Sequence, residues 1–132
     1  MPDWVEIYKK APELLDKILS WDEVVLFKEA CSCESGEDFN DGLLVLTNQN
    51  IIFIRRDSFE PVYEVGLRAP IKNISYITYS GIFYQMIEME VEVEGCLKKF
   101  NFMDFTTYVN GERKVSEICE ELQKIIDTAT QK

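Results

Sequence analysis

Two short apolar runs joined by four polar residues constrain the fold of this chain more than any other feature. Residues 43–46 and 51–54 are rich in residues that favour β-strands, and residues 47–50 (Thr-Asn-Gln-Asn) connect them. Apolar runs of this length around a short polar connection predict a β-hairpin. Similar segments follow along the chain, so we expect a mainly β fold.

The other strand-like segments follow at short intervals. We expect strands at residues 24–29, 62–66 and 73–79, with a polar loop at 31–41. A turn at residues 57–61 and a break at Ala69-Pro70 separate them, because proline and glycine interrupt strands.

Residues 87–94 give the clearest strand, because apolar and acidic residues alternate strictly. The apolar set is Ile87, Met89, Val91 and Val93, and the acidic set is Glu88, Glu90, Glu92 and Glu94. A period of two predicts one buried face and one solvated face. If Glu94-Gly95 forms a two-residue turn, Phe100 lies opposite Met89, Phe102 opposite Ile87 and Lys99 opposite Glu90. That register leaves Lys98 on the apolar face, which a bulge or a slipped turn would repair.

Helical patterns occupy both ends of the chain. Residues 3–19 have helical spacing that is interrupted at Pro12, and their second half carries an apolar stripe. We expect this arm to pack on the sheet; the alternative, a membrane-surface helix, normally has a basic polar face, which this arm lacks. Residues 111–129 predict an amphipathic helix with apolar residues at Val115, Ile118, Cys119, Leu122, Ile125, Ile126 and Ala129.

The charge of the chain bears on its partners and its compartment. A net charge of −10, from 24 acidic and 14 basic residues, repels nucleic-acid phosphates and anionic lipids. The first thirty residues contain no signal-peptide pattern, and no apolar run approaches the roughly 18 residues of a membrane span. We therefore expect a soluble cytoplasmic protein with four reduced cysteines.

Seven expected strands followed by one helix resemble the pleckstrin-homology-like superfold. Residues 42–48 (Gly-Leu-Leu-Val-Leu-Thr-Asn) with 51–54 are similar to the opening of GRAM and bacterial PH-like domains, and residues 71–74 and 100–102 fit later landmarks. The resemblance covers about residues 24–129. It implies a half-open barrel of two nearly perpendicular antiparallel sheets, capped by the C-terminal helix. Residues 1–22 are then an N-terminal helical extension, and residues 23–132 the PH-like domain.

Phosphoinositide-binding members of this superfold hold phosphates with a basic first hairpin loop. The equivalent loop here carries Glu34, Glu37, Asp38 and Asp41 and no basic residue, so lipid binding at that loop is disfavoured. A lesser anion site could form from Arg55, Arg56 and Lys72, with Arg68 nearby; the alternative is a solvated barrel rim.

No pattern in the sequence indicates catalysis or a cofactor. The chain has no histidine, the commonest general base near neutral pH, and the glutamates of residues 88–94 lie on a solvated face. Cys31 and Cys33 lack the further paired ligands of a zinc site, and residues 37–41 lack the spacing of a calcium loop. We therefore expect no enzyme, no metal and no cofactor.

Binding of a polypeptide is the remaining class. In the peptide-binding branch of the superfold, the fifth strand and the C-terminal helix form the groove, which implies a site at residues 73–79 with Tyr76, Thr78 and Tyr79 as candidates. The alternative is that these tyrosines pack on the helix or on the arm, and the arm itself could fill the groove. We predict a non-enzymatic cytoplasmic adaptor for a basic protein partner. The alternatives are GRAM-type lipid or membrane-surface recognition and self-association through edge strands.

Overall fold

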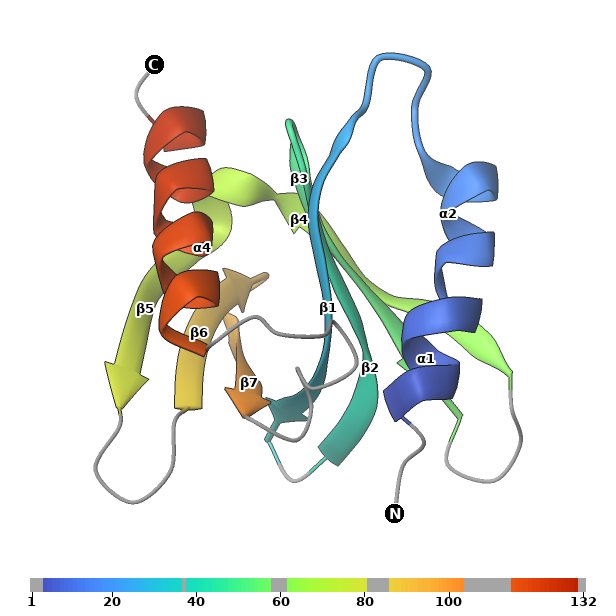
Figure 1. The fold of residues 1–132 in the computed structure, drawn as a ribbon, viewed down its shortest axis with the longest axis horizontal. Helices are drawn as coiled ribbons and strands as arrows, with labels where there is room; N and C mark the ends of the chain where they lie inside the picture. The colour runs from blue at the N-terminus through green and yellow to red at the C-terminus, as the bar shows by residue number, and fades with distance from the viewer. Residues whose placement is uncertain (1–3, 37, 58–61, 81–85, 104–114, 131–132) are drawn as a thin grey trace.

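The computed structural model describes residues 4–36, 38–57, 62–80, 86–103 and 115–130. In chain order its elements are α1 (Trp4–Lys10), α2 (Pro12–Ile18), β1 (Val25–Ser35), β2 (Asp38–Thr47), β3 (Asn50–Arg56), β4 (Tyr63–Pro70), the 3₁₀ turn η1 (Ile71–Asn73), β5 (Ile74–Ser80), β6 (Met86–Val93), β7 (Cys96–Met103) and α4 (Val115–Thr130). The fold is mainly β, as the sequence predicts (Figure 1). None of the described helices is long and apolar enough to cross a membrane.

All seven strands belong to one open antiparallel sheet in the order β4-β3-β2-β1-β7-β6-β5. The two sheets implied by the resemblance are therefore two parts of one continuous ladder. They meet where β1 pairs with β7 over only three residue pairs, Ser32–Asn101, Cys33–Phe100 and Glu34–Lys99. Figure 1 shows α4 beside the β5–β7 part and the two N-terminal helices on the opposite side of the molecule.

The predicted register of β6 and β7 is confirmed. Phe100 lies opposite Met89 and Lys99 opposite Glu90, across a turn in which Glu94 and Gly95 have positive φ angles of 51° and 81°. Two residues with positive φ match the right-handed twist of a hairpin. Lys98 stays opposite Val91 on the apolar face, and neither a bulge nor a slipped turn moves it away.

The prediction of a polar loop at residues 31–41 is wrong. β1 continues to Ser35 and β2 begins at Asp38, with Gly36 at a φ of 61° between them. The side chains of Cys31 and Cys33 are buried in the core, so the polar residues between and after them occupy alternate positions of a strand. β4 likewise continues through the predicted break to Pro70, because an edge strand tolerates a residue without an N–H.

Two hydrophobic clusters lie on opposite faces of the sheet. On the concave face, Ile118, Leu122 and Ile126 of α4 pack in a cluster with Phe100 and Phe102 of β7. On the convex face, α1 and α2, which we call the arm, bury Ile7, Ala11 and Leu15 against Ala30, Leu43, Val45, Ile52 and Ile54. The expectation that the arm packs on the sheet is confirmed. The alternative that the arm fills the groove beside β5 is wrong, because its buried residues pack on β1, β2 and β3.

A buried carboxylate fixes the segment between the arm and β1. Glu23 Oε2 accepts hydrogen bonds from Thr47 Oγ1 (2.6 Å) and Asn50 Nδ2 (2.9 Å). Glu23 Oε1 forms an ion pair with Arg68 Nη2 (2.8 Å) and accepts a hydrogen bond from the Ser20 amide (3.2 Å). Burial raises the pKa of Glu23, but the hydrogen bonds from Thr47, Asn50 and Ser20 and the charge of Arg68 lower it by more, so it lies below its ordinary value.

The β2–β3 connection also holds the chain on either side of Glu23. Asn48 Oδ1 accepts a hydrogen bond from the Val24 amide (2.8 Å), and Asn48 Nδ2 donates to the Asp22 carbonyl (3.2 Å). Arg68 Nη1 donates to the Ile18 carbonyl at the end of α2 (2.6 Å). The Thr-Asn pair of the β2–β3 connection therefore fixes how the chain leaves the arm and enters the sheet.

Candidate functional site

The residues predicted to form a peptide groove lie on β5, at one edge of the sheet. Within the described residues β5 pairs only with β6, so its other backbone edge has no strand partner there. Ile74 and Ile77 of β5 pack against the core cluster that contains Ile118 of α4. The strand is therefore fixed by one face and one edge, and no described strand pairs with its remaining edge.

The three predicted groove residues occupy different register positions on β5. Tyr76 pairs with Glu90 and Thr78 with Glu88, whereas Tyr79 pairs with Ile87, whose side chain is buried. A register shift between Ile74 and Tyr76 sets this alternation. Thr78 is exposed; the side chains of Tyr76 and Tyr79 lie outside the described part of the structure. Whether these three residues bind a peptide stays a prediction.

Acidic residues lie on β6, the strand that pairs with β5, and directly after it. Glu92 and Glu94 are exposed, Glu88 and Glu90 are half-buried, and Lys99 Nζ lies 4.0 Å from Glu88 Oε1. A pair at that distance, with both side chains partly exposed, contributes little to stability. The row of carboxylates therefore makes this face of the sheet negative.

The residues of the predicted anion site lie in three separate places, because Arg55 and Arg56 are consecutive residues of β3 and point to opposite faces of the sheet. Arg55 forms an ion pair with Glu64 of β4, and Arg56 Nε lies 3.5 Å from Glu6 Oε1 of α1. Lys72 follows the opposite end of β4, roughly 17 Å away by five residues of strand rise, and shares a shallow depression with Glu92 and Glu94. The structure does not bring Arg55, Arg56 and Lys72 together. Anion binding by these residues stays a prediction.

The contact between Glu6 and Arg56 also fastens the arm. Tyr63 OH donates a 2.9 Å hydrogen bond to the same carboxylate oxygen, Glu6 Oε1. Burial and the hydrogen bond to Glu6 raise the pKa of Tyr63 to about 12. The tyrosine is therefore a neutral donor at any ordinary pH, and both groups hold α1 on β3 and β4.

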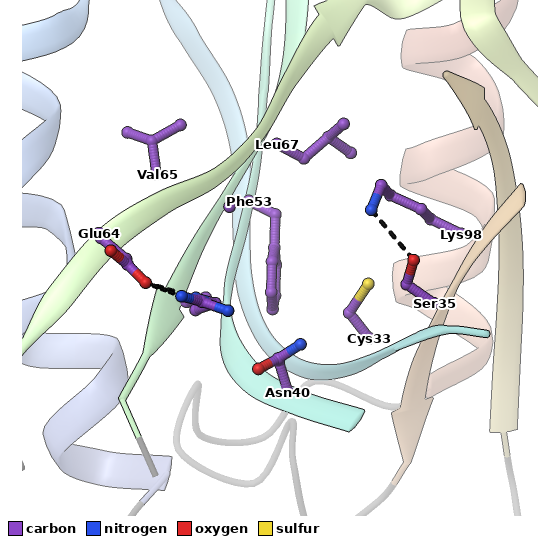
Figure 2. A pocket seen from close by; sticks show the side chains of 10 residues that line it. Cys33, Ser35, Asn40, Phe53, Glu64, Val65, Leu67 and Lys98 are labelled. Atoms are coloured by element: carbon purple, nitrogen blue, oxygen red, sulfur yellow. Dashed lines mark hydrogen bonds and ion pairs between the residues drawn. The ribbon is translucent and has the colours of Figure 1, made fainter. Parts of the chain in front are cut away.

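A cleft of about 320 Å³ opens on the concave side of the barrel, where β3 and β4 face β7. Its lining residues are Cys33, Ser35, Asn40, Phe53, Arg55, Glu64, Val65, Gly66, Leu67 and Lys98. Figure 2 shows Glu64 on one side, Lys98 and Ser35 on the other, and Phe53 between them. Glu64 forms its ion pair with Arg55. The only indication of this cleft in the sequence was the position of Lys98 on the apolar face of its strand.

The thiols of β1 lie on the concave face and belong to the core. Cys31 is fully buried and Cys33 nearly so, while Cys96 is exposed. Burial raises the pKa of Cys31, and burial raises that of Cys33 to about 11 although the charge of Lys98 acts in the opposite direction. In the described part of the chain, no three histidine, cysteine, aspartate or glutamate side chains are placed to hold one metal ion. These two thiols are poor nucleophiles and poor metal ligands at neutral pH.

The architecture is that of a seven-stranded half-barrel with a C-terminal helix on its concave side. No family model and no curated protein matches the sequence. Solved structures do match it. The N-terminal PH domain of Vps36 is 15% identical, with a TM-score of 0.57 over 87% of each chain. The hSac2 domain of the human phosphoinositide phosphatase Sac2 is 13% identical, with a TM-score of 0.60 over 99% of this chain and 84% of that one.

A third match is the apo structure of the activated truncation of Vav1, with 9% identity and a TM-score of 0.58. It covers 96% of this chain and 34% of that one. Together the matches show that the fold is pleckstrin-homology-like, as the resemblance implied. At these identities they show the fold alone, so closeness to GRAM domains stays a prediction.

Proposed function

We propose that this protein is a non-enzymatic, cytoplasmic protein-binding domain that takes an extended peptide along β5, beside α4. The observation that carries the proposal is the edge position of β5, which pairs with β6 alone among the described strands. An added strand would satisfy backbone donors and acceptors of β5, and side-chain pockets would supply specificity.

The charge around this edge favours a basic peptide. Glu88, Glu90 and Glu92 lie on β6, the strand adjacent to β5, and Glu94 comes directly after it. The whole chain carries a net charge of −10. Opposite charges increase the rate of encounter and select against acidic competitors. An adaptor of this kind would therefore bind segments rich in lysine or arginine.

Lipid recognition of the GRAM type has weaker support. Arg55 and Arg56 both have carboxylate partners, Glu64 and Glu6, so a phosphate would have to displace them. Lys72 lies beside Glu92 and Glu94, whose charges repel an anion. For these reasons we favour a protein partner.

The test begins with a displayed library of extended random peptides, selected on the pure protein. We expect basic sequences, and we expect the best of them to shift the amide NMR signals of residues 74–80 and of α4. Glu92→Lys should weaken binding several-fold; Glu13→Lys, the same change on an exposed residue of α2, should not. Vesicles of phosphatidylcholine and phosphatidylserine should not bind.

Other results would overturn the proposal. Peptide shifts confined to residues outside β5 and α4 would place the site elsewhere. Vesicle binding that Arg55→Glu abolishes would favour lipid recognition instead. A molecular mass that rises with concentration, with no peptide selected, would favour self-association through edge strands.

A further inference from the structure

The face of β6 and β7 that is turned away from the core, which we call the outer face, carries an excess of carboxylates. Glu88, Glu90 and Glu92 alternate along β6 with three residues whose side chains are fully buried. On β7, Lys99 pairs with Glu90, and its Nζ lies 4.0 Å from Glu88 Oε1. The three carboxylates of β6 therefore outnumber the one ammonium group that β7 places among them.

The register of β5 continues this outer face toward the edge of the sheet. Thr78 pairs with Glu88, and Tyr76 occupies the position opposite Glu90. Thr78 is short and exposed. A strand added beside β5 would lie about 10 Å from the backbone of β6, which is two strand spacings. A lysine or arginine on that strand, opposite Thr78, is long enough to approach the carboxylate of Glu88 over the threonine.

The opposite face of β5 is apolar and adjoins α4. Ile77, which precedes Thr78, pairs with the buried Met89 and packs against the core cluster. Cys119 and Ile125 of α4 are half-buried and pack against the same cluster. Figure 1 shows α4 beside β5. A side chain that an added strand turns to this face therefore meets apolar surface.

A strand that pairs with β5 presents its side chains to these two faces in turn. The positions opposite Thr78 and Tyr76 belong to the outer face with its carboxylates, and the position opposite Ile77 belongs to the face beside α4. A block of consecutive basic residues would turn every second charge toward apolar surface, which costs free energy. The two faces therefore favour a particular order of residues and not only a basic composition.

We infer that the peptide bound along β5 alternates basic and apolar residues, with lysine or arginine opposite Thr78 and Tyr76 and an apolar residue opposite Ile77. This inference rests on the proposed function, because it describes the ligand of the same strand edge. It adds the order of the residues, whereas the net charge of the chain favours a basic composition in any order.

The test compares two peptides of identical composition. The alternating probe is acetyl-Ser-Lys-Val-Lys-Val-Lys-Ser-amide, and the blocked probe is acetyl-Ser-Lys-Lys-Lys-Val-Val-Ser-amide. A third probe has glutamate in place of lysine in the alternating order. In titrations of the full chain followed by amide NMR, the alternating lysine probe should bind at least about tenfold more tightly than the blocked probe and shift residues 74–80. Long-range attraction to the acidic protein acts equally on the two lysine probes, because their charges are the same.

Paired variants test the carboxylates of the outer face. Glu88→Gln combined with Glu90→Gln should weaken binding of the alternating lysine probe about fivefold, because two exposed ion pairs with the peptide are lost. Glu13→Gln combined with Asp16→Asn removes two charges from exposed positions of α2 and should change the affinity less than about twofold. Urea denaturation checks that both variants are folded.

The possible results separate this inference from the proposed function. If the blocked probe binds at β5 as tightly as the alternating one, or if the paired variant on β6 loses no affinity, the alternation is wrong and a basic peptide at β5 is retained. If the glutamate probe binds at β5 as tightly as the lysine probe, strand addition is retained and the charge pattern is wrong. If no probe binds, the inference is overturned, and the proposed function is overturned with it only if the displayed library also yields no ligand for β5.

Discussion

Thr47 Oγ1 donates a 2.6 Å hydrogen bond to Glu23 Oε2, across 24 positions of the sequence. The same hydroxyl oxygen accepts hydrogen bonds from the amides of Gln49 (3.1 Å) and Asn50 (2.9 Å). One side chain therefore shapes the β2–β3 connection and fastens the segment that joins the arm to β1. Neither Thr47 nor Glu23 is exposed, so water cannot replace these bonds.

Replacement of Thr47 by valine should destabilise the protein. The change keeps the shape of the side chain but removes a donor to a buried carboxylate, which costs about 2 kcal/mol. Urea denaturation should show a lower midpoint with an unchanged m-value. Thr78→Val on the exposed edge of β5 is the matched control and should stay within about 0.5 kcal/mol of the unchanged protein. Equal effects of the two changes would contradict the role of Thr47.

The contribution of Glu23 should depend on pH. Its pKa in the folded protein lies below the ordinary value, since its hydrogen bonds and Arg68 outweigh the opposing effect of burial. A group of this kind contributes its full stability above its unfolded pKa of about 4.3 and loses that contribution as the pH falls through the lower folded pKa. The difference in unfolding free energy between the unchanged protein and Glu23→Gln should therefore be largest near neutral pH and shrink below about pH 4.

Denaturation at a series of pH values measures this difference. Glu13→Gln on an exposed position of α2 serves as the control, and its difference should be small throughout. A constant difference between Glu23→Gln and the unchanged protein from pH 7 down to about pH 3 would show that the charge of Glu23 is not what stabilises the fold.

The arm should unfold together with the sheet. Ile7 is fully buried against the convex face, so Ile7→Ala should cost about 2–5 kcal/mol. Val5 is 46% exposed on the same helix, and Val5→Ala should cost far less. Far-ultraviolet circular dichroism and tryptophan fluorescence should give one coincident transition for each variant. Separate transitions would mean that the arm folds independently.

The four thiols should react at different rates with an aromatic disulfide reagent. Cys96 is exposed and should react first, and Cys119 is half-buried and should react more slowly. Cys31 and Cys33 should react only when the protein opens, because they are buried and their pKa values are raised. Cys96→Ser should remove the fast phase. Rapid modification of Cys33 in that variant under native conditions would contradict the described burial.

Alternation in the sequence was sufficient for the β6–β7 hairpin and its register. Strict period-two patterning and a Glu-Gly turn leave one register that buries Met89 and Phe100 together. The arm and the final helix were also predictable, because a stripe of apolar residues at helical spacing normally packs against the core.

The predictions failed where polar residues lie within the core or at its edge. Residues 31–41 look like a loop because serine, glycine and acidic residues dominate them, yet Cys31 and Cys33 supply enough buried surface for a strand. Tertiary pairing there outweighs local propensity. The partners of Arg55 and Arg56 could not be predicted either, since Glu64 and Glu6 reach them only after β4 and the arm are in place.

The brief pairing of β1 with β7 does not divide the molecule, because the core beneath α4 is shared by both halves of the sheet. Phe27 of β1 packs edge-on against Phe102 of β7, with ring centroids 6.2 Å apart, and Phe53 of β3 packs against Phe100 of β7 at 5.3 Å. Neither half can open without exposing apolar surface of the other, so both should open in one cooperative step. Deuterium should therefore enter the amides of residues 99–101 as slowly as those of residues 43–46.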